Sequence, residues 1–250
     1  MIRQSTCRWQ RVIRVLRLGF HVIKALLTVS LVYPFLTAQK RDGVLSRWSR
    51  DLLAHLGVEV CIHGSSVPST AKGAIFLVAN HISWLDIFAI NSVLPTCFIA
   101  KSEIRDWPIL GWLCEKAGTV FIRRQKMRDL SRLDVMLKQR FIDQVTVGAF
   151  LEGTTTDGRT VLPFKSGLLR AALQTGTPIL PVALQYCHED GSLCDQAAFV
   201  GEKTLASSLK EILGIRKIFV HVHLLPMMDG VQRTRQELAL AIREAILQKI

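Results

Sequence analysis

The chain has 250 residues, enough for one large domain or two small ones. Hydrophobic residues make up 49% of it, which excludes a disordered chain and allows a sizeable core. Because 32 lysines and arginines outnumber 20 acidic residues, the formal net charge is +12, which indicates an anionic partner: nucleic acid, an anionic membrane surface or a phosphorylated substrate.

The amino-terminal segment is first basic and then apolar. Arginines at positions 3, 8, 11, 14 and 17 form a basic stripe on a helix, and an apolar stretch follows over residues 18–38. Its uncharged part, Ala25 to Ala38, would be about 21 Å long as a helix, against a membrane core of about 30 Å. Basic residues flank it on both sides, and Pro34 would interrupt a helix. We expect insertion at the interface or into one leaflet; a single spanning helix, a cleaved signal peptide and a buried helix are the alternatives.

Beyond this segment, strand patterns and helix patterns alternate. Short apolar or alternating runs predict strands at 57–64, 73–80, 96–101, 119–124, 145–153, 177–186 and 217–225. Helices are predicted at 83–94, 106–118, 128–144, 166–176 and 233–250. This order predicts an α/β fold with a mostly parallel, covered sheet flanked by helices. No repeat or linker divides it, so we expect a membrane-binding helical arm over residues 1–50 and one α/β domain over residues 51–250.

Cysteines and most histidines give no sign of a metal site. The six cysteines are dispersed and form no C-x-x-C pair, which is typical of reduced thiols in the cytosol. Cys187, His188 and Cys194 fit no common zinc template. His221 and His223 share one strand face without an evident third ligand, so we expect them to be structural or to face substrate.

The stretch VANHISWLDIF, residues 78–88, carries the strongest chemical signal, because Asp86 follows His81 by five residues. Ser83 to Asp86 is also a capping-box pattern for a helix beginning at Ser83. Both interpretations can hold, since a carboxylate in the first helical turn can face a histidine in the preceding loop. There it would fix the imidazole tautomer and stabilise the imidazolium formed during proton abstraction.

Two further stretches end predicted strands with polar residues. GTVFIRR, residues 118–124, ends in Arg123 and Arg124, whose guanidinium groups suit a phosphate or carboxylate; a solvated basic face is the alternative. FLEGTTTDG, residues 150–158, presents Glu152 and a free backbone amide where a strand ends, a position at which polar ligands bind.

Taken in order, these stretches resemble the four sequence blocks of the glycerolipid acyltransferase family. NHISWLD resembles the first block, NH-x-S-x-x-D, GTVFIRR the second and FLEGTTTDG the third, while PILPVALQY, with Pro181, resembles the fourth. AKSEI, residues 100–104, resembles the basic segment between the first two. The resemblance implies an acyltransferase that moves a fatty acyl group from acyl-CoA or acyl carrier protein to the free hydroxyl of a lysolipid, with no cofactor and no metal.

The resemblance also assigns roles to particular residues. His81 would deprotonate the acceptor hydroxyl and Asp86 would orient His81. Lys101, Arg123 and Arg124 would hold the anionic head of the acceptor. Glu152, Gly153 and Thr154 would shape the acceptor and oxyanion side.

The third block departs from its usual form, F-P-E-G-T-R-S. Leu151 replaces the proline, and Thr155 replaces the arginine and so removes a cation from the acceptor side. The form found here is similar to that of family members that acylate lyso-ornithine lipid. We keep 1-acyl-sn-glycerol-3-phosphate, which would give phosphatidic acid, as the first candidate acceptor and lyso-ornithine lipid as the alternative.

The expected partners are a membrane lipid acceptor, acyl-CoA or acyl carrier protein, and an anionic membrane surface at the cytoplasmic face of the inner membrane. Nucleic acid is not expected, because aromatic residues are only 7% and no nucleic-acid motif appears. A basic, non-enzymatic membrane-binding protein is the alternative from a different class. A serine hydrolase is disfavoured, because the chain has no G-x-S-x-G.

Overall fold

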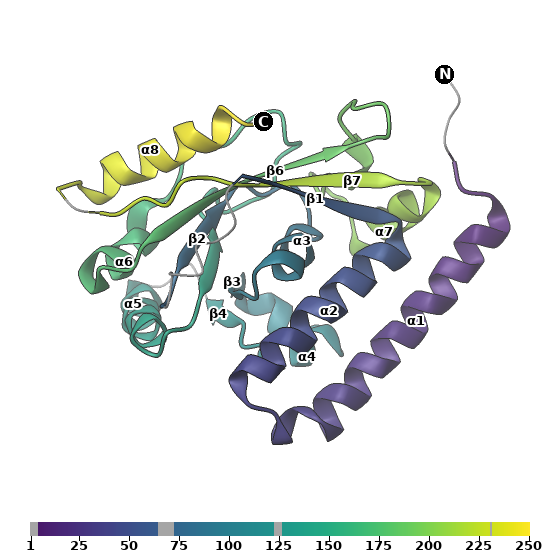
Figure 1. Ribbon diagram of the computed structural model, residues 1–250, viewed down its shortest axis with the longest axis horizontal. Coiled ribbons are helices and arrows are strands. Elements are labelled where there is room, and N and C mark those ends of the chain that lie inside the picture. The colour runs from purple at the N-terminus through teal and green to yellow at the C-terminus, as the bar shows by residue number, and fades with distance from the viewer. Residues whose placement is uncertain (1–4, 65–72, 123–126, 231) are drawn as a thin grey trace.

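The computed structural model describes residues 5–64, 73–122, 127–230 and 232–250, without the side chains of residues 127–130. A pair of long helices is followed by an α/β domain (Figure 1). The α-helices are α1 Arg8–Leu31, α2 Ala38–Leu56, α3 Asp86–Val93, α4 Leu110–Lys116, α5 Met127–Ile142, α6 Leu169–Thr175, α7 Leu205–Gly214 and α8 Arg235–Leu247. The strands are β1 Val58–Gly64, β2 Phe76–Ala79, β3 Cys97–Lys101, β4 Val120–Ile122, β5 Val147–Phe150, β6 Ile179–Cys187 and β7 Ile218–Leu224. Short 3-10 helices lie at Tyr33–Phe35, Ser102–Asp106, Ser166–Leu168 and Asp195–Ala197.

The strands form a seven-stranded sheet in the order β1-β7-β6-β2-β5-β3-β4. The strands from β6 to β4 run parallel to one another, whereas β7 pairs antiparallel with β6 and carries β1 parallel beside it. The prediction of a mostly parallel sheet is therefore confirmed. Because β2, β3, β4 and β5 are parallel, their carboxyl ends meet at one edge, where polar ligands bind in sheets of this kind.

Helices cover the sheet on both faces. Along β2, Leu77 and Ala79 pack into a core shared with α2, α3 and α7, whereas Phe76 and Val78 pack into a second core shared with α5, α6 and α8. A strand buried on both faces reads as a continuous apolar run, which is why FLVA was recognisable in the sequence. The central strands are thus held rigidly between two apolar layers.

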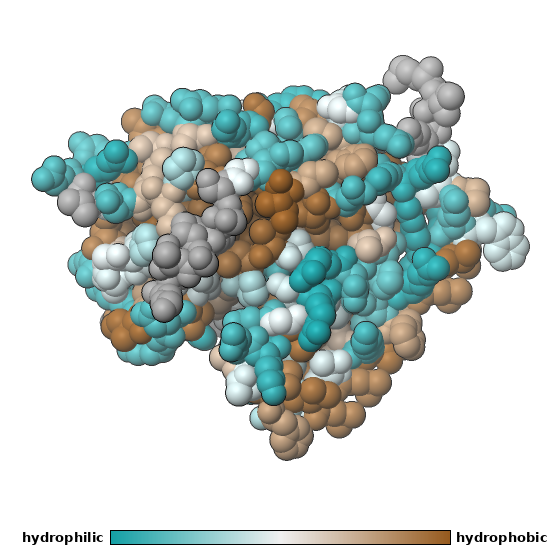
Figure 2. Space-filling view, viewed as in Figure 1, coloured by the Kyte–Doolittle hydropathy of each residue, from teal (hydrophilic) through white to brown (hydrophobic). Residues whose placement is uncertain are grey.

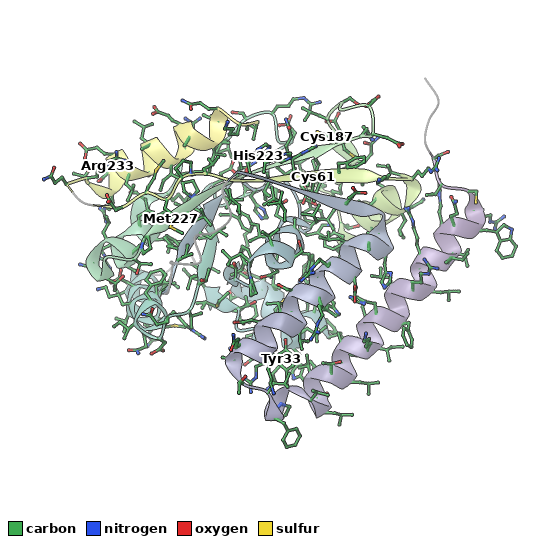
Figure 3. The ribbon with its side chains drawn as sticks, viewed as in Figure 1. Tyr33, Cys61, Cys187, His223, Met227 and Arg233 are labelled. Carbon is green, nitrogen blue, oxygen red and sulfur yellow. The ribbon has the colours of Figure 1, made fainter. Side chains whose placement is uncertain are left out.

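Helices α1 and α2 form the arm, with Pro34 in the first turn of the 3-10 helix between them and Tyr33 at the same turn (Figure 3). The division expected at residue 50 falls inside α2, which continues to Leu56 and packs on α3. Arg14 of the predicted basic stripe turns toward the domain and donates to the carbonyl oxygens of Ile215 at 2.7 Å and Arg216 at 2.6 Å. The amino-terminal part of α1 is thereby fastened to the domain.

The outer side of α1 is apolar and exposed. Figure 2 shows hydrophobic residues along the outer edge of the arm. The exposed apolar residues of α1 include Leu16, Phe20, Leu27 and Leu31. Phe35, at the turn between the arm helices, is 86% exposed. Within the described residues, no helix combines the length and the apolar character that crossing a membrane requires.

Two helical segments differ from the sequence prediction. Segment 106–118 was predicted as one helix, but Pro108 follows the 3-10 helix that ends at Asp106, and α4 begins only at Leu110. Helix α7 was not predicted, although Thr204 caps it by accepting a hydrogen bond from the amide of Ser207 at 3.1 Å.

Candidate active site

His81 and Asp86 meet at the carboxyl end of β2. His81 lies in the loop after the strand, and its Nδ1 is 2.8 Å from Oδ2 of Asp86, the first residue of α3. Because an ionised carboxylate only accepts hydrogen bonds, Nδ1 carries the hydrogen and Nε2 is left as the acceptor. No described residue hydrogen-bonds Nε2, and the His81 side chain is 21% exposed. Nε2 of His81 is therefore available to accept a proton from a substrate.

Asp86 is 0% exposed and is surrounded by donors. The amides of Ile82 and Ser83 donate to Oδ2 at 2.8 and 2.9 Å, and the Tyr186 hydroxyl, from β6, donates to Oδ1 at 2.8 Å. Burial, followed by the nearby Asp86, raises the pKa of Tyr186 well above its ordinary value, so the phenol keeps its proton and donates. These hydrogen bonds offset the cost of burying the carboxylate and fix its position.

The capping box predicted at Ser83 is only half formed. The amide of Ser83 donates to Asp86, but the Ser83 hydroxyl is buried without a hydrogen-bond partner among the described residues. Helix α3 begins at Asp86 rather than at Ser83. The reason is that one carboxylate oxygen gathers His81 and two amides, which draws residues 81–83 into a tight loop around it instead of a helical turn.

Glu152 holds this loop against the end of β5. Its Oε1 accepts from the amide of His81 at 2.7 Å and its Oε2 from the amide of Leu162 at 2.8 Å. Burial raises the pKa of Glu152 above its ordinary value, although the two amides and His81 act in the opposite direction. Both oxygens are already engaged, so the carboxylate joins three segments of the backbone around His81.

The residues after Glu152 are placed differently from the prediction. The amide of Gly153, expected to be free, donates to the carbonyl of Phe150 at 3.3 Å. Gly153 has φ of +81°, a left-handed conformation that favours glycine, so it closes a tight turn. Thr154 follows it on the surface with its side chain exposed.

Three rings are stacked beside the pair. The His81 ring lies on Phe150 with centroids 3.9 Å apart and planes 8° apart, and Phe150 lies on Phe98 at 5.4 Å and 9°. Stacking fixes the plane of the imidazole, while Asp86 fixes its rotation within that plane. The exposed Nε2 therefore has a defined direction.

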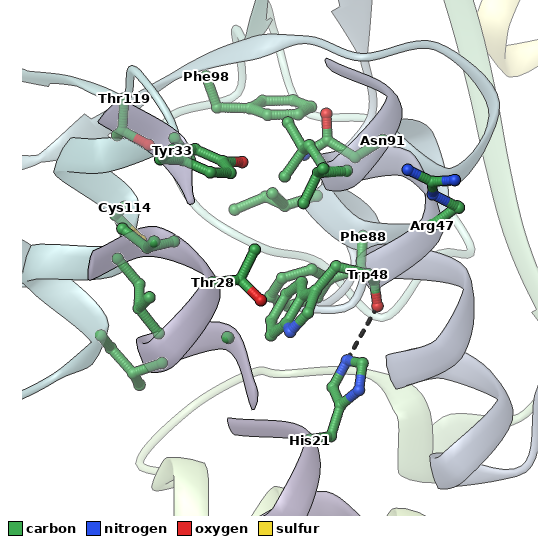
Figure 4. Close-up of a pocket in the computed structure, with 18 of the residues that line it drawn as sticks. His21, Thr28, Tyr33, Arg47, Trp48, Phe88, Asn91, Phe98, Cys114 and Thr119 are labelled. Atoms are coloured by element: carbon green, nitrogen blue, oxygen red, sulfur yellow. Dashed lines mark hydrogen bonds between the residues drawn. The ribbon is translucent and has the colours of Figure 1, made fainter. Parts of the chain in front are cut away.

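Two cavities each include one ring of this stack in their walls. The first, which we call the arm cavity, has a volume of about 480 Å³ and includes Phe98 in its wall. Helices α1 and α2 form one side of it and α3 and α4 another, and its lining is mainly apolar (Figure 4). His21 lies in it with Nε2 3.0 Å from the carbonyl oxygen of Trp48, and burial lowers the pKa of His21.

The second cavity, which we call the cationic cleft, has a volume of about 520 Å³ and includes Phe150 and Gly153 in its wall. It lies on the face of the sheet that α5, α6 and α8 cover. Lys165, Arg170 and Arg235 line it together with apolar residues. Phe98 thus borders an apolar cavity and Phe150 a basic one, while His81 is in the described lining of neither.

The basic residues predicted to bind substrate are only partly located. Lys101 lies exposed at the end of β3, opposite Ile122 of β4, and is absent from the described lining of both cavities. Arg123 and Arg124 lie outside the described residues; in the sequence they follow Ile122, which lines the cationic cleft.

Three other histidines lie on the sheet, away from His81. His63 joins His221 and His223 on the β1–β7 pair, with Nε2 of His63 2.8 Å from Nδ1 of His221 (His223 in Figure 3). No group of three or more histidines, cysteines or acidic residues in the described part of the chain is arranged to hold a metal ion.

Sequence reasoning missed Tyr186, Phe150 and Lys165. Tyr186 had a usable signal, because a tyrosine that closes an apolar strand needs a partner for its hydroxyl. The fold and the site together define an α/β enzyme in which a buried carboxylate orients a histidine at the carboxyl end of a parallel strand.

The chain belongs to the Acyltransferase family, whose model matches residues 59–185. The lyso-ornithine lipid O-acyltransferase of Pseudomonas aeruginosa is 37% identical over 210 residues, 82% of this chain and 78% of that protein. The 1-acyl-sn-glycerol-3-phosphate acyltransferase of Neisseria meningitidis is 34% identical over 196 residues, 78% of this chain and 75% of that protein. The crystal structure of the 1-acyl-sn-glycerophosphate (LPA) acyltransferase PlsC from Thermotoga maritima matches with a TM-score of 0.70 at 22% identity, over 96% of this chain and 95% of that one, and supports the fold.

The resemblance stated from the sequence blocks is confirmed, and the chain is an acyltransferase of lipid biosynthesis. Its relatives divide between two acceptor lipids.

Proposed function

We propose that this enzyme moves a fatty acyl group from acyl-CoA or acyl carrier protein to the free hydroxyl of a lysolipid. The first candidate acceptor is 1-acyl-sn-glycerol-3-phosphate, for which the product is phosphatidic acid. The observation that carries the proposal is the His81–Asp86 pair, because Nδ1 is bound to a fully buried carboxylate and Nε2 is free to accept a proton.

In this mechanism, Nε2 of His81 takes the proton of the acceptor hydroxyl as the oxygen attacks the thioester carbonyl carbon. A carbon–oxygen bond forms, and the carbon–sulfur bond of the donor breaks. The thiolate leaves and takes the proton back from the imidazolium, which Asp86 stabilises in the meantime. His81 acts only as a base and acid, so no acyl group is attached to the protein, and no cofactor or metal takes part.

The arm supports access to a membrane lipid. Helix α1 buries only His21 and Ala25, while its outer apolar residues are exposed, a pattern typical of helices that lie in one leaflet. The proposed location is the cytoplasmic face of the inner membrane, with the arm inserted at the interface. The arm cavity, which is apolar, would then accommodate an acyl chain.

Lyso-ornithine lipid is the second candidate acceptor. The hydroxyl of Thr155, where the third block usually has arginine, donates to the carbonyl of Phe199, so this position supplies no cation for a phosphate. The relative from Pseudomonas aeruginosa is named for this acceptor.

The test is acyl transfer by the purified protein in neutral detergent, with labelled acyl-CoA or acyl carrier protein. Lysophosphatidate and lyso-ornithine lipid are offered in parallel. We expect transfer to lysophosphatidate, and a loss of at least about a hundredfold in His81→Ala, since general bases contribute about 10²–10⁴-fold. Transfer to lyso-ornithine lipid alone would select the second acceptor.

The same variant separates catalysis from membrane binding. Wild type and His81→Ala should float equally with anionic vesicles, because His81 lies outside the arm. Equal binding without any transfer by the wild type to either acceptor would exclude both candidate acceptors.

A further inference from the structure

The cationic cleft adjoins the histidine but has no part in the proton transfer described above. It lies where β3, β4 and β5 end, and Phe150 forms part of its wall and also stacks on His81. Much of the lining is apolar: Ile99, Ile122, Leu137, Phe150, Leu151 and Leu168. A ligand in the cleft would therefore contact Phe150, the ring that stacks on the reacting histidine.

The charges around the cleft do not cancel. Arg170 donates from Nε to Asp134 at 3.0 Å, and Lys138 pairs with the other oxygen of Asp134 at 2.9 Å. Burial raises the pKa of Asp134, but these two cations outweigh burial and hold the pKa below its ordinary value, so the carboxylate is fully engaged. Lys165 and Arg235, in contrast, have no hydrogen bond or ion pair from their side chains to any described residue. Among the described residues, two positive charges in this cleft therefore have no compensating partner.

The backbone that carries Lys165 is fixed relative to His81. The amide of Lys165 donates to the carbonyl of Leu151 at 2.9 Å, and three residues earlier Leu162 donates to Glu152, which also holds the amide of His81. From α8, Arg243 donates to the carbonyl of Val161 at 2.8 Å. Lys165 is therefore attached to the same framework as the histidine, which suits a residue that positions a substrate.

We propose that Lys165 and Arg235 form a binding subsite for the anionic group of a substrate, a phosphate or a carboxylate. The subsite rests on the proposed function, since it deepens the account of the same site. Lysine supplies a compact charge and arginine a fork that binds two oxygens at once. The apolar part of the lining contacts the aliphatic portion next to the anion. Either substrate could supply this anionic group: the acceptor through its head group, or the donor through the phosphate of its phosphopantetheine arm.

The test compares Lys165→Ala, Arg235→Ala and the double variant in steady-state kinetics in neutral detergent. The acceptor is varied at saturating donor, and then the donor at saturating acceptor. We expect each substitution to raise one KM about tenfold and to change kcat less than about twofold, because the cations bind substrate without moving protons. Lys165→Arg keeps the charge and should retain most of the affinity.

The matched control is Lys210→Ala with Arg216→Ala, which removes two exposed cations from α7 and the segment after it, on the opposite side of the domain from α5 and α6 (Figure 1). A rise in the acceptor KM alone assigns the anion to the head group, and a rise in the donor KM alone assigns it to the donor. An active double variant with both KM values unchanged overturns the subsite, as does an equal effect of the control pair.

Binding of inorganic phosphate gives a readout that does not depend on acyl transfer. Phosphate should raise the melting temperature of the wild type in a concentration-dependent way, and this shift should disappear in the double variant but persist in the control. A wild type that transfers acyl groups to neither acceptor would contradict the proposed function. The phosphate-dependent change in melting temperature would still test whether the subsite binds anions. An identical shift in wild type and double variant overturns it.

Discussion

Replacing Tyr186 by phenylalanine removes one hydrogen bond and leaves the ring in place. The Tyr186 hydroxyl donates at 2.8 Å to Oδ1 of Asp86, which is 0% exposed, so water cannot replace it without rearrangement. Hydrogen bonds to charged groups contribute about 1.5–3 kcal/mol, and we expect the free energy of unfolding to fall by about that amount. For a protein of this size the melting temperature should then fall by about 3–12 °C.

The same substitution should lower kcat by about three- to tenfold and leave both KM values unchanged. Asp86 keeps the amides of Ile82 and Ser83 and the imidazole of His81 on its other oxygen, so the pair survives with a less constrained carboxylate. Thermal unfolding followed by circular dichroism gives the stability, and initial rates at saturating substrates give kcat.

The control is Tyr33→Phe, at the only other tyrosine in the chain. No described residue hydrogen-bonds the Tyr33 hydroxyl, so its removal should change the stability by less than about 0.5 kcal/mol. If Tyr186→Phe melts and turns over like the wild type, the hydroxyl does not hold Asp86 and the reasoning is refuted.

Three further outcomes are expected. Glu152→Gln should lower activity at least about tenfold and stability by about 1–3 kcal/mol in urea unfolding, because its amide group would face a backbone donor; wild-type behaviour would contradict the account of Glu152. Burial raises the pKa of Asp134 but its two cationic partners hold it below 3.8, so its ion pairs should stabilise the fold above about pH 4 and be lost as the pH falls further. Urea unfolding at assay conditions from roughly pH 2.5 to pH 6 measures this effect. The free energy of unfolding should fall less with acid in Asp134→Asn than in the wild type, and an identical pH dependence in the two proteins would count against the ion pairs. Leu16→Ser with Phe20→Ser should weaken vesicle binding at least about tenfold in a flotation assay, and undiminished binding would exclude α1 as the inserted element.

The sequence predicts best what is local along the chain. His81 and Asp86 are five residues apart across a strand end and a helix start, so a contact between them could be expected from the sequence. The same locality misled at Ser83, where the capping-box pattern was present but the carboxylate was engaged by the histidine and two amides. A pattern of residue types does not reveal which of several donors an acceptor will take.

Contacts between distant segments could not be predicted in this way. Tyr186, 100 residues from Asp86 in the sequence, reaches it only because β6 lies beside β2. Local sequence patterns do not predict this order of the strands. For a similar reason, the sequence does not reveal that Lys165 and Arg235 have no partner among the described residues. A cation can be recognised as unpaired only when the partners of its neighbours are known, as Asp134 illustrates by engaging Arg170.

The arm cavity has walls from two bodies, with His21 and Trp48 on the arm and Phe88 and Leu113 on the domain. A molecule that fills it contacts both sides and so binds best when the arm is docked. By thermodynamic linkage, docking of the arm strengthens binding in the cavity by the same factor by which an occupant strengthens docking. A substitution that loosened the contact between arm and domain would therefore weaken binding in the cavity without touching the ligand.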